Sequence, residues 1–125
     1  MNVLDASAVL AFLFAEEGQE TVAALLDGSL LSSVNLAEVL SRFARDGLPV
    51  SEVRTALSET GLEVVPFDDA QALLAAALVP HTSRLGLSLG DRACLALAAT
   101  VQGTAITADR AWAGLDADIR VQVLR

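Results

Sequence analysis

Apolar and polar positions along the chain follow two alternating patterns. Short runs that are uniformly apolar and bounded by turn residues are typical of strands buried on both faces. Such runs occupy residues 2–5, 30–34, 62–67, 104–109 and 119–124. Longer segments with polar starts and helically spaced apolar residues predict helices over 7–17, 18–28, 35–47, 51–61, 68–86 and 88–103.

Glycine and proline mark the predicted helix ends. Glycines at 28, 47, 61, 86 and 103 follow the helical patterns, and we expect them to stop the helices in a left-handed conformation. Pro80 lies inside the fifth pattern and is expected to end or kink that helix. No repeat, linker or low-complexity segment interrupts the alternation.

Strands that alternate with helices and have no polar face indicate a mostly parallel sheet covered on both sides. The predicted fold is therefore α/β, a three-layer α/β/α arrangement around a central sheet of about five strands. At 125 residues the chain has the size of one ordinary domain, and we expect residues 1–125 to form it.

Composition indicates whether the domain has an interface and whether it contacts a membrane. Hydrophobic residues make up 54% of the chain, which favours use of part of the surface as an interface, and we expect a homodimer. The longest apolar stretches fall short of the roughly 18 residues that a membrane span needs, and no basic segment opens the chain. We therefore expect a soluble, cytoplasmic protein with no membrane partner.

Charge and cysteine usage exclude several kinds of site. The formal net charge is −8 and all eight basic residues are arginine, so a fold-wide basic footprint for nucleic acid is absent. Cys94 is the single cysteine and lies in an apolar run, which favours a small core residue. His81 is the single histidine, so a zinc site is not expected.

Carboxylates stand where the fold would place a ligand, at the carboxyl ends of the strands. Asp5 and Asp109 end the first and fourth predicted strands. Glu38 and Asp91 lie near the starts of the third and sixth predicted helices. The sequence alone allows two interpretations of these four acids.

The first interpretation is helix capping. Asn35 and Glu38, like Ser88 and Asp91, have the spacing of a capping box, whereas Asp5 and Asp109 suit N-cap positions. The second is a metal site. Two carboxylates ~5 Å apart repel by about 3 kcal/mol at an effective dielectric near 20, more than the roughly 1 kcal/mol that a cap returns. A hard cation such as Mg²⁺ or Mn²⁺ would neutralise a convergent group of this kind.

Four segments carry a family resemblance. "NVLDASAVLAFL", "SSVNLAEVL", "LSLGDRACLALA" and "AITADRAW" resemble the four acidic motifs of the PIN-domain family, in the order found in VapC-type toxins of toxin–antitoxin pairs. The resemblance implies a Mg²⁺- or Mn²⁺-dependent ribonuclease, a small antitoxin whose tail covers the pocket, and a toxin dimer. It also implies the site residues: the acids Asp5, Glu38, Asp91 and Asp109, with Ser7 and Thr107 as polar supports.

These residues suggest a division of roles. We expect Asp5 and Asp91 to bind the metal directly, Glu38 to be a ligand or general base, and Asp109 to be a ligand, directly or through water. A metal-activated water would then hydrolyse the RNA phosphodiester and leave a 5′-phosphate and a 3′-hydroxyl.

Positive charge near the acids would let an RNA phosphate approach. Arg92 and Arg110 each directly follow a site acid. Each could bind a phosphate or could equally well face solvent on a helix. Arg42 and Arg45 fit a solvated face better than a phosphate track. Trp112 is expected in the core or an interface.

Three other functions are alternatives to a ribonuclease toxin. A phosphoacceptor domain would need a lysine to stabilise phosphate, and the chain has none. A PIN nuclease acting in RNA maturation or on single-stranded DNA stays open, as does a catalytically silent PIN-fold interaction module. Whether Asp116 extends the pocket is also open.

Overall fold

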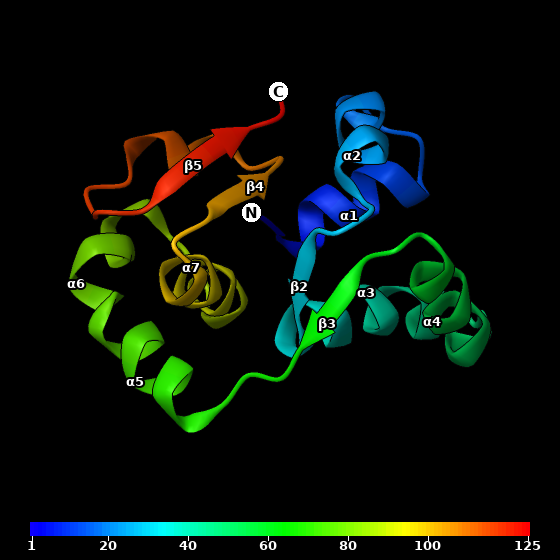
Figure 1. Cartoon of the computed structure of the whole chain (residues 1–125), viewed down its shortest axis with the longest axis horizontal. Helices are drawn as coiled ribbons and strands as arrows, with labels where there is room; N and C mark the ends of the chain where they lie inside the picture. Colours follow the sequence, from blue (N-terminus) through cyan, green and yellow to red (C-terminus); the bar gives the residue numbers. More distant parts are fainter.

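A five-stranded parallel sheet forms the centre of the molecule (Figure 1). The structure is a computed structural model that describes residues 1–125. The strands, in the spatial order β3-β2-β1-β4-β5, are β1 (Asn2–Leu4), β2 (Leu30–Ser32), β3 (Glu63–Val65), β4 (Thr104–Thr107) and β5 (Arg120–Val123). The predicted α/β class and the parallel sheet of five strands are confirmed.

Helices connect successive strands and cover both faces of the sheet (Figure 1). They are α1 (Ala6–Leu13), α2 (Gln19–Leu25), α3 (Ser33–Arg45), α4 (Val50–Glu59), α5 (Asp69–Ala77), α6 (Val79–Thr82) and α7 (Leu89–Val101), with 3₁₀ turns η1 (Ser83–Leu85) and η2 (Arg110–Gly114). None of the helices has the length and apolar character that a membrane crossing would require.

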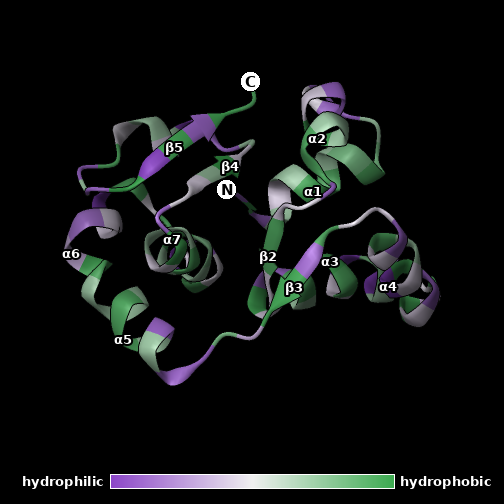
Figure 2. Ribbon diagram, viewed as in Figure 1, coloured by the Kyte–Doolittle hydropathy of each residue, from purple (hydrophilic) through white to green (hydrophobic).

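The central strands send alternate side chains into two separate cores. In β1, Val3 belongs to one buried cluster and Leu4 to the other, because successive side chains of a strand point to opposite faces. Leu4 packs with residues of α1, α2 and α4, whereas Val3 packs with α7 and with Trp112. Cys94 and Trp112 are buried in the second cluster, as expected for core residues. Figure 2 shows predominantly apolar colours along α7.

Several predicted boundaries are wrong by a few residues. The helix predicted at 35–47 begins at Ser33, because the Ser32 hydroxyl accepts a hydrogen bond from the Val34 N–H and caps it earlier. The first helix ends at Leu13 and does not reach residue 17. The long pattern 68–86 divides after Ala77, and Pro80 lies in the first turn of a new short helix, which confirms the expected interruption.

The left-handed glycines are confirmed at 28, 47, 61 and 86, but not at Gly103. Gln102 takes the left-handed position there, with φ of 53°. A Cβ on Gly103 would collide with the Met1 carbonyl oxygen, which accepts the Thr104 N–H. Gly103 is therefore required for close approach of the chain start to β4.

Candidate functional site

Asp5 is the buried centre of the site. β1 ends at Leu4, and Asp5 is the N-cap of α1, where its Oδ1 accepts the Ala8 N–H at 2.8 Å. The side chain is only 3% exposed. Ser7 Oγ donates to the carboxylate at 2.7 Å, and Thr107 Oγ1 donates to Oδ2 at 2.6 Å. The expected capping role and the polar support from Ser7 and Thr107 are both present.

The two hydroxyls join Asp5 to the end of β4. Ser7 Oγ lies 3.2 Å from Thr107 Oγ1 and accepts the Ala108 N–H at 2.9 Å. Thr107 Oγ1 accepts the Asp109 N–H at 3.0 Å. Because β1 and β4 are neighbours in a parallel sheet, their carboxyl ends meet at one edge and bring residues a hundred positions apart into contact.

Burial raises the pKa of Asp5 from 3.8 to about 6. The hydrogen bonds from Thr107, Ser7 and Ala8 act in the opposite direction, since they favour the charged form. The charge of Asp91 raises the pKa further and is the smallest of these causes. Removal of Asp5 from water therefore outweighs repulsion among the carboxylates, which was the main cost expected from the sequence.

Asp91 lies in the first turn of α7 and forms a capping box with Ser88. Ser88 Oγ accepts the Asp91 N–H at 3.2 Å, and Asp91 Oδ2 accepts the Ser88 N–H at 2.8 Å. The side chain is partly buried. The capping interpretation is confirmed for this pair, and it uses one oxygen of Asp91.

Glu38 and Asn35 do not form the capping box that their spacing suggested. Both lie inside α3, because Ser32 is the cap. Instead, Asn35 Nδ2 donates to Glu38 Oε1 at 2.8 Å and to the Gly90 carbonyl oxygen at 2.9 Å. Asn35 is buried whereas Glu38 is exposed. The link through Gly90 holds Glu38 beside the first turn of α7.

Asp109 lies at the exposed rim. Its Oδ1 accepts the Ala111 N–H at 3.0 Å and so caps η2, as the capping interpretation expects. It reaches the centre of the site through its own N–H, which binds Thr107. The second carboxylate oxygen carries no hydrogen bond from the protein.

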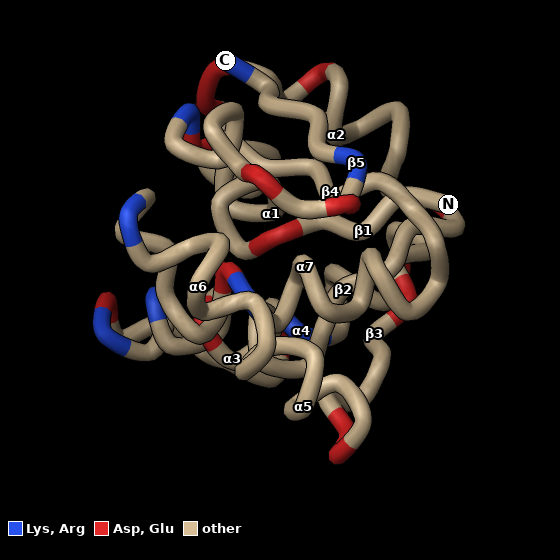
Figure 3. Tube along the Cα trace, turned by 90° about the vertical axis from the view of Figure 1, so that its left-hand side faces the viewer, with Lys and Arg blue, Asp and Glu red and all other residues tan.

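Three of the acids lie near enough to Cys94 on α7 to act on its thiol through their charge. Burial raises the pKa of the Cys94 thiol, and the charges of Asp5, Asp91 and Glu38 raise it further. The strands and helices therefore bring these carboxylates to one region, and Asp109 joins them through Thr107. No group of three His, Cys, Asp or Glu side chains is arranged to hold a metal ion. Figure 3 shows acidic positions at α1 and near the ends of β4 and β5.

The neighbouring arginines differ in their contacts. Arg92 Nη1 donates to the Ala75 carbonyl oxygen at 3.0 Å, which ties α7 to α5. Arg110 is exposed and makes no hydrogen bond. The Asp116 side chain makes no contact with the acids, and its backbone carbonyl oxygen lies 2.8 Å from His81 Nδ1.

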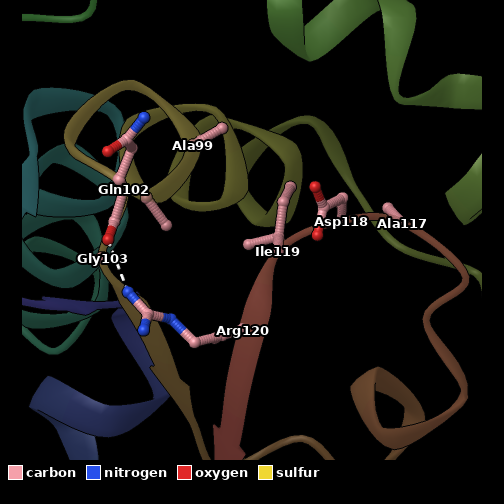
Figure 4. Close-up of a pocket in the computed structure, with 8 residues that line it drawn as sticks. Ala99, Gln102, Gly103, Ala117, Asp118, Ile119 and Arg120 are labelled. Atoms are coloured by element: carbon pink, nitrogen blue, oxygen red, sulfur yellow. Dashed lines mark hydrogen bonds between the residues drawn. The ribbon is translucent and has the colours of Figure 1, made fainter.

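Two hollows have different relations to the site. A groove of about 550 Å³ between α1 and α3 includes Glu38 in its wall, together with Ala6, Leu10, Val34, Ala37, Ser41, Arg42 and Arg45. A second pocket of about 480 Å³ lies beside the starts of β4 and β5, where Arg120 donates to the Gln102 carbonyl oxygen (Figure 4). This pocket lies at the amino ends of the strands, whereas Asp5 lies at the carboxyl end of β1. The pocket therefore does not belong to the acidic site.

Two residues of the site were not predicted in these roles: Asn35, which supports Glu38, and Gly90, which lies beside it. Signals for both were present. Asn35 precedes Glu38 by three positions, which places both on one helix face. Gly90 interrupts a helix that is otherwise rich in alanine and leucine, and a helical glycine needs a packing reason because it costs stability.

Several solved structures are similar to this chain in fold. A toxin–antitoxin complex from Klebsiella pneumoniae superposes with a TM-score of 0.73 at 17% identity, covering 96% of this chain and 99% of that one. FitAcB from Neisseria gonorrhoeae gives 0.68 at 21% identity, with 97% and 96% covered. VapBC-5 from Mycobacterium tuberculosis gives 0.59 at 27% identity, with 99% and 97% covered. No curated protein sequence matches the chain.

The family itself is established by the sequence as a whole. The model of the PIN domain matches residues 3–117. This range includes Asp5, Glu38, Asp91 and Asp109 and every helix of the structure. With its parallel sheet and an acidic site at the sheet's carboxyl edge, the chain belongs to the PIN-domain family.

Proposed function

We propose that this protein is a metal-dependent endoribonuclease, the toxin of a toxin–antitoxin pair, which hydrolyses RNA phosphodiesters with water. The observation that carries the proposal is Asp5, an acid that the fold buries and surrounds with donors from Ser7, Thr107 and Ala8. A carboxylate ionised in such a place destabilises the fold, and a cation would relieve that cost. Membership of the PIN family supports a nuclease, and the toxin–antitoxin neighbours support the biological role.

The residues of the site fit Mg²⁺ or Mn²⁺ in their chemistry. All the charged donors are carboxylates, which hard divalent cations prefer. Asp5, Asp91, Glu38 and Asp109 would hold the ion, and a rotamer change would be needed to bring them together, since no three are arranged for it. Asp109 is exposed and has room for that change. When bound, the metal would lower the pKa of a water and neutralise phosphate charge.

The protein's own residues would divide the remaining work. Ser7 and Thr107 fix the orientation of Asp5 by their hydrogen bonds. Glu38 Oε2, which carries no hydrogen bond, is available as a ligand or as a base for the attacking water. Attack by water on phosphorus would leave a 5′-phosphate and a 3′-hydroxyl. Arg110 is exposed beside Asp109 and could bind a substrate phosphate, whereas Arg92 would first have to leave Ala75.

The decisive experiment is cleavage of structured and single-stranded RNAs in the presence of Mg²⁺, Mn²⁺ or EDTA. We expect cleavage that requires the divalent ion and is lost in Asp91→Asn and Asp5→Asn. Activity that survives EDTA, or that survives both substitutions, would refute the proposal. Cleavage of single-stranded DNA in preference to RNA would support the alternative PIN nuclease.

The proposed partner is a small antitoxin with a basic tail. The groove between α1 and α3 has an apolar floor and carries Glu38, Arg42 and Arg45 along its α3 wall. A peptide that lays an apolar side chain in the groove could reach the acidic cluster with an arginine or lysine. We expect co-expression with such an antitoxin to give a complex. Substitution of every basic residue in the partner's tail should abolish inhibition, and unchanged inhibition would contradict this contact.

A homodimer in the cytoplasm, where RNA is available, completes the proposal. Exposed apolar side chains on α5 and α6 favour self-association, with Leu73 69% exposed and Leu74 and Val79 also on the surface. Sedimentation at micromolar concentration should give a dimer. A monomer under those conditions would refute the dimer without affecting the nuclease.

A catalytically silent interaction module is the second candidate. The Asp91 capping box and the lack of a preformed metal geometry favour it, because a capping role alone accounts for Asp91 and no three acids are arranged around an ion. Calorimetric titration with Mn²⁺ separates the two. A nuclease should bind the ion, and Asp5→Asn should weaken the binding, whereas a silent module should give no heat of binding.

A further inference from the structure

The Glu38 carboxylate is held at a defined place although its side chain is exposed. Asn35 Nδ2 donates to its Oε1 at 2.8 Å and at the same time to the Gly90 carbonyl oxygen at 2.9 Å. Both Glu38 oxygens also occupy the space that a Cβ on residue 90 would need. Two elements distant in sequence, α3 and α7, thus fix a surface glutamate that would otherwise sample many rotamers.

The orientation of the Asn35 amide follows from its neighbours. With Nδ2 toward Glu38 and Gly90, both of its hydrogens meet oxygen acceptors, whereas the flipped amide would place Oδ1 against two oxygens. The cost of this orientation is visible, because Oδ1 is buried without a hydrogen-bond partner in a side chain only 1% exposed. The amide therefore holds Glu38 in position and also links α3 to α7.

Gly90 gives the carboxylate its space. It lies in the first turn of α7, and its φ is not in the left-handed region, so alanine would satisfy the backbone and favour the helix. A Cβ at this position, however, would collide with all three atoms of the Glu38 carboxylate. The glycine therefore serves contact with Glu38 and not backbone conformation.

We infer that Asn35 and Gly90 are positioning residues. They hold Glu38 Oε1 against the start of α7 and leave Oε2 free to bind the metal ion of the acidic site. The inference rests on the proposed metal-dependent function. Together, Asn35 and Gly90 present one oxygen of Glu38 beside Asp91, the residue that follows Gly90. Neither residue touches the substrate or the ion.

A double-mutant cycle tests this contact. Mn²⁺ affinity by calorimetry and the melting temperature in EDTA are measured for the parent, Gly90→Ala, Glu38→Ala and the double variant. In the parent, Gly90→Ala should weaken Mn²⁺ binding about tenfold, the lower range for supports of metal ligands, and lower the melting temperature. In the Glu38→Ala background the same change should leave Mn²⁺ affinity unaltered and raise the melting temperature, because no carboxylate remains to collide.

Gln71 supplies a matched control for Asn35. It is also a buried amide with one orphan oxygen, but it lies on α5 and donates to Pro66. Asn35→Ala should lower Mn²⁺ affinity, whereas Gln71→Ala should lower only the melting temperature. Equal effects of Gly90→Ala in both Glu38 backgrounds, or equal loss of affinity in the two amide variants, would overturn the inference alone. A parent protein that binds no Mn²⁺ would overturn the proposed function and the inference with it.

Discussion

Replacement of Asp5 by asparagine should stabilise the metal-free protein in a pH-dependent way. Burial raises the pKa of Asp5 from 3.8 to about 6. At about 1.4 kcal/mol per pH unit, the difference between these values means that ionised Asp5 lowers the free energy of unfolding by about 3 kcal/mol. Asparagine resembles the neutral acid in shape and keeps the oxygen that accepts the Ala8 N–H.

The sign follows from proton binding. Between pH 3.8 and about 6 the folded protein retains the Asp5 proton that the unfolded chain has released. The folded state then binds more protons, so the free energy of unfolding falls as the pH rises through this window. The penalty is absent below the window and complete above it.

We therefore expect Asp5→Asn to raise the free energy of unfolding by about 3 kcal/mol near pH 8 in EDTA, with a rise of roughly 10 °C in melting temperature. The gain should vanish toward about pH 4. Urea unfolding followed by circular dichroism at both pH values measures it. Asp69→Asn, an exposed change of the same charge on α5, is the control and should have little effect at either pH.

A gain of equal size at both pH values would show that burial of the Asp5 charge is not its source. A variant less stable than the parent near pH 8 would refute the reasoning altogether. It would mean that the donors from Ser7 and Thr107 stabilise the carboxylate by more than its burial costs.

Three further predictions concern the same edge of the sheet. Saturating Mg²⁺ should raise the melting temperature of the parent more than that of Asp5→Asn, since a ligand stabilises only the state that binds it; equal shifts would contradict Asp5 as a ligand. Thr107→Val removes a hydrogen bond to the charged form and should raise the pKa of Asp5 further, so the rise of Mn²⁺-dependent activity should move to higher pH, and an unmoved pH–rate profile would argue against it. Ser88→Ala should lower the free energy of unfolding by about 1 kcal/mol in urea through loss of the α7 cap, and no loss would deny the capping box its role.

The fold could be predicted because the local pattern and the global arrangement agree. Val3 and Leu4 are both apolar, which already requires two covered faces, and the structure places them in two cores. The Ser88–Asp91 cap was also predictable, because it depends only on neighbouring residues.

The contacts that the sequence could not supply are those between distant segments. The spacing of Asn35 and Glu38 is compatible with a capping box, and only the position of α7 shows that the amide turns to Gly90. Likewise, the spacing of the acids says nothing of their exposure. In the structure Asp5 is buried and Asp109 is exposed. Desolvation of Asp5 therefore raises its pKa more than repulsion by the other acids does.

The central place of β1 in the sheet has a consequence for the order in which the protein is made. Asp5 is synthesised 102 residues before its partner Thr107, which belongs to β4. Contacts over such a separation form only after most of the domain is available. A nascent chain that stops before β4 therefore carries Asp5 without Thr107 or the Asp109 rim. The acidic site is completed only after β4 has been made, so shorter nascent chains remain without it.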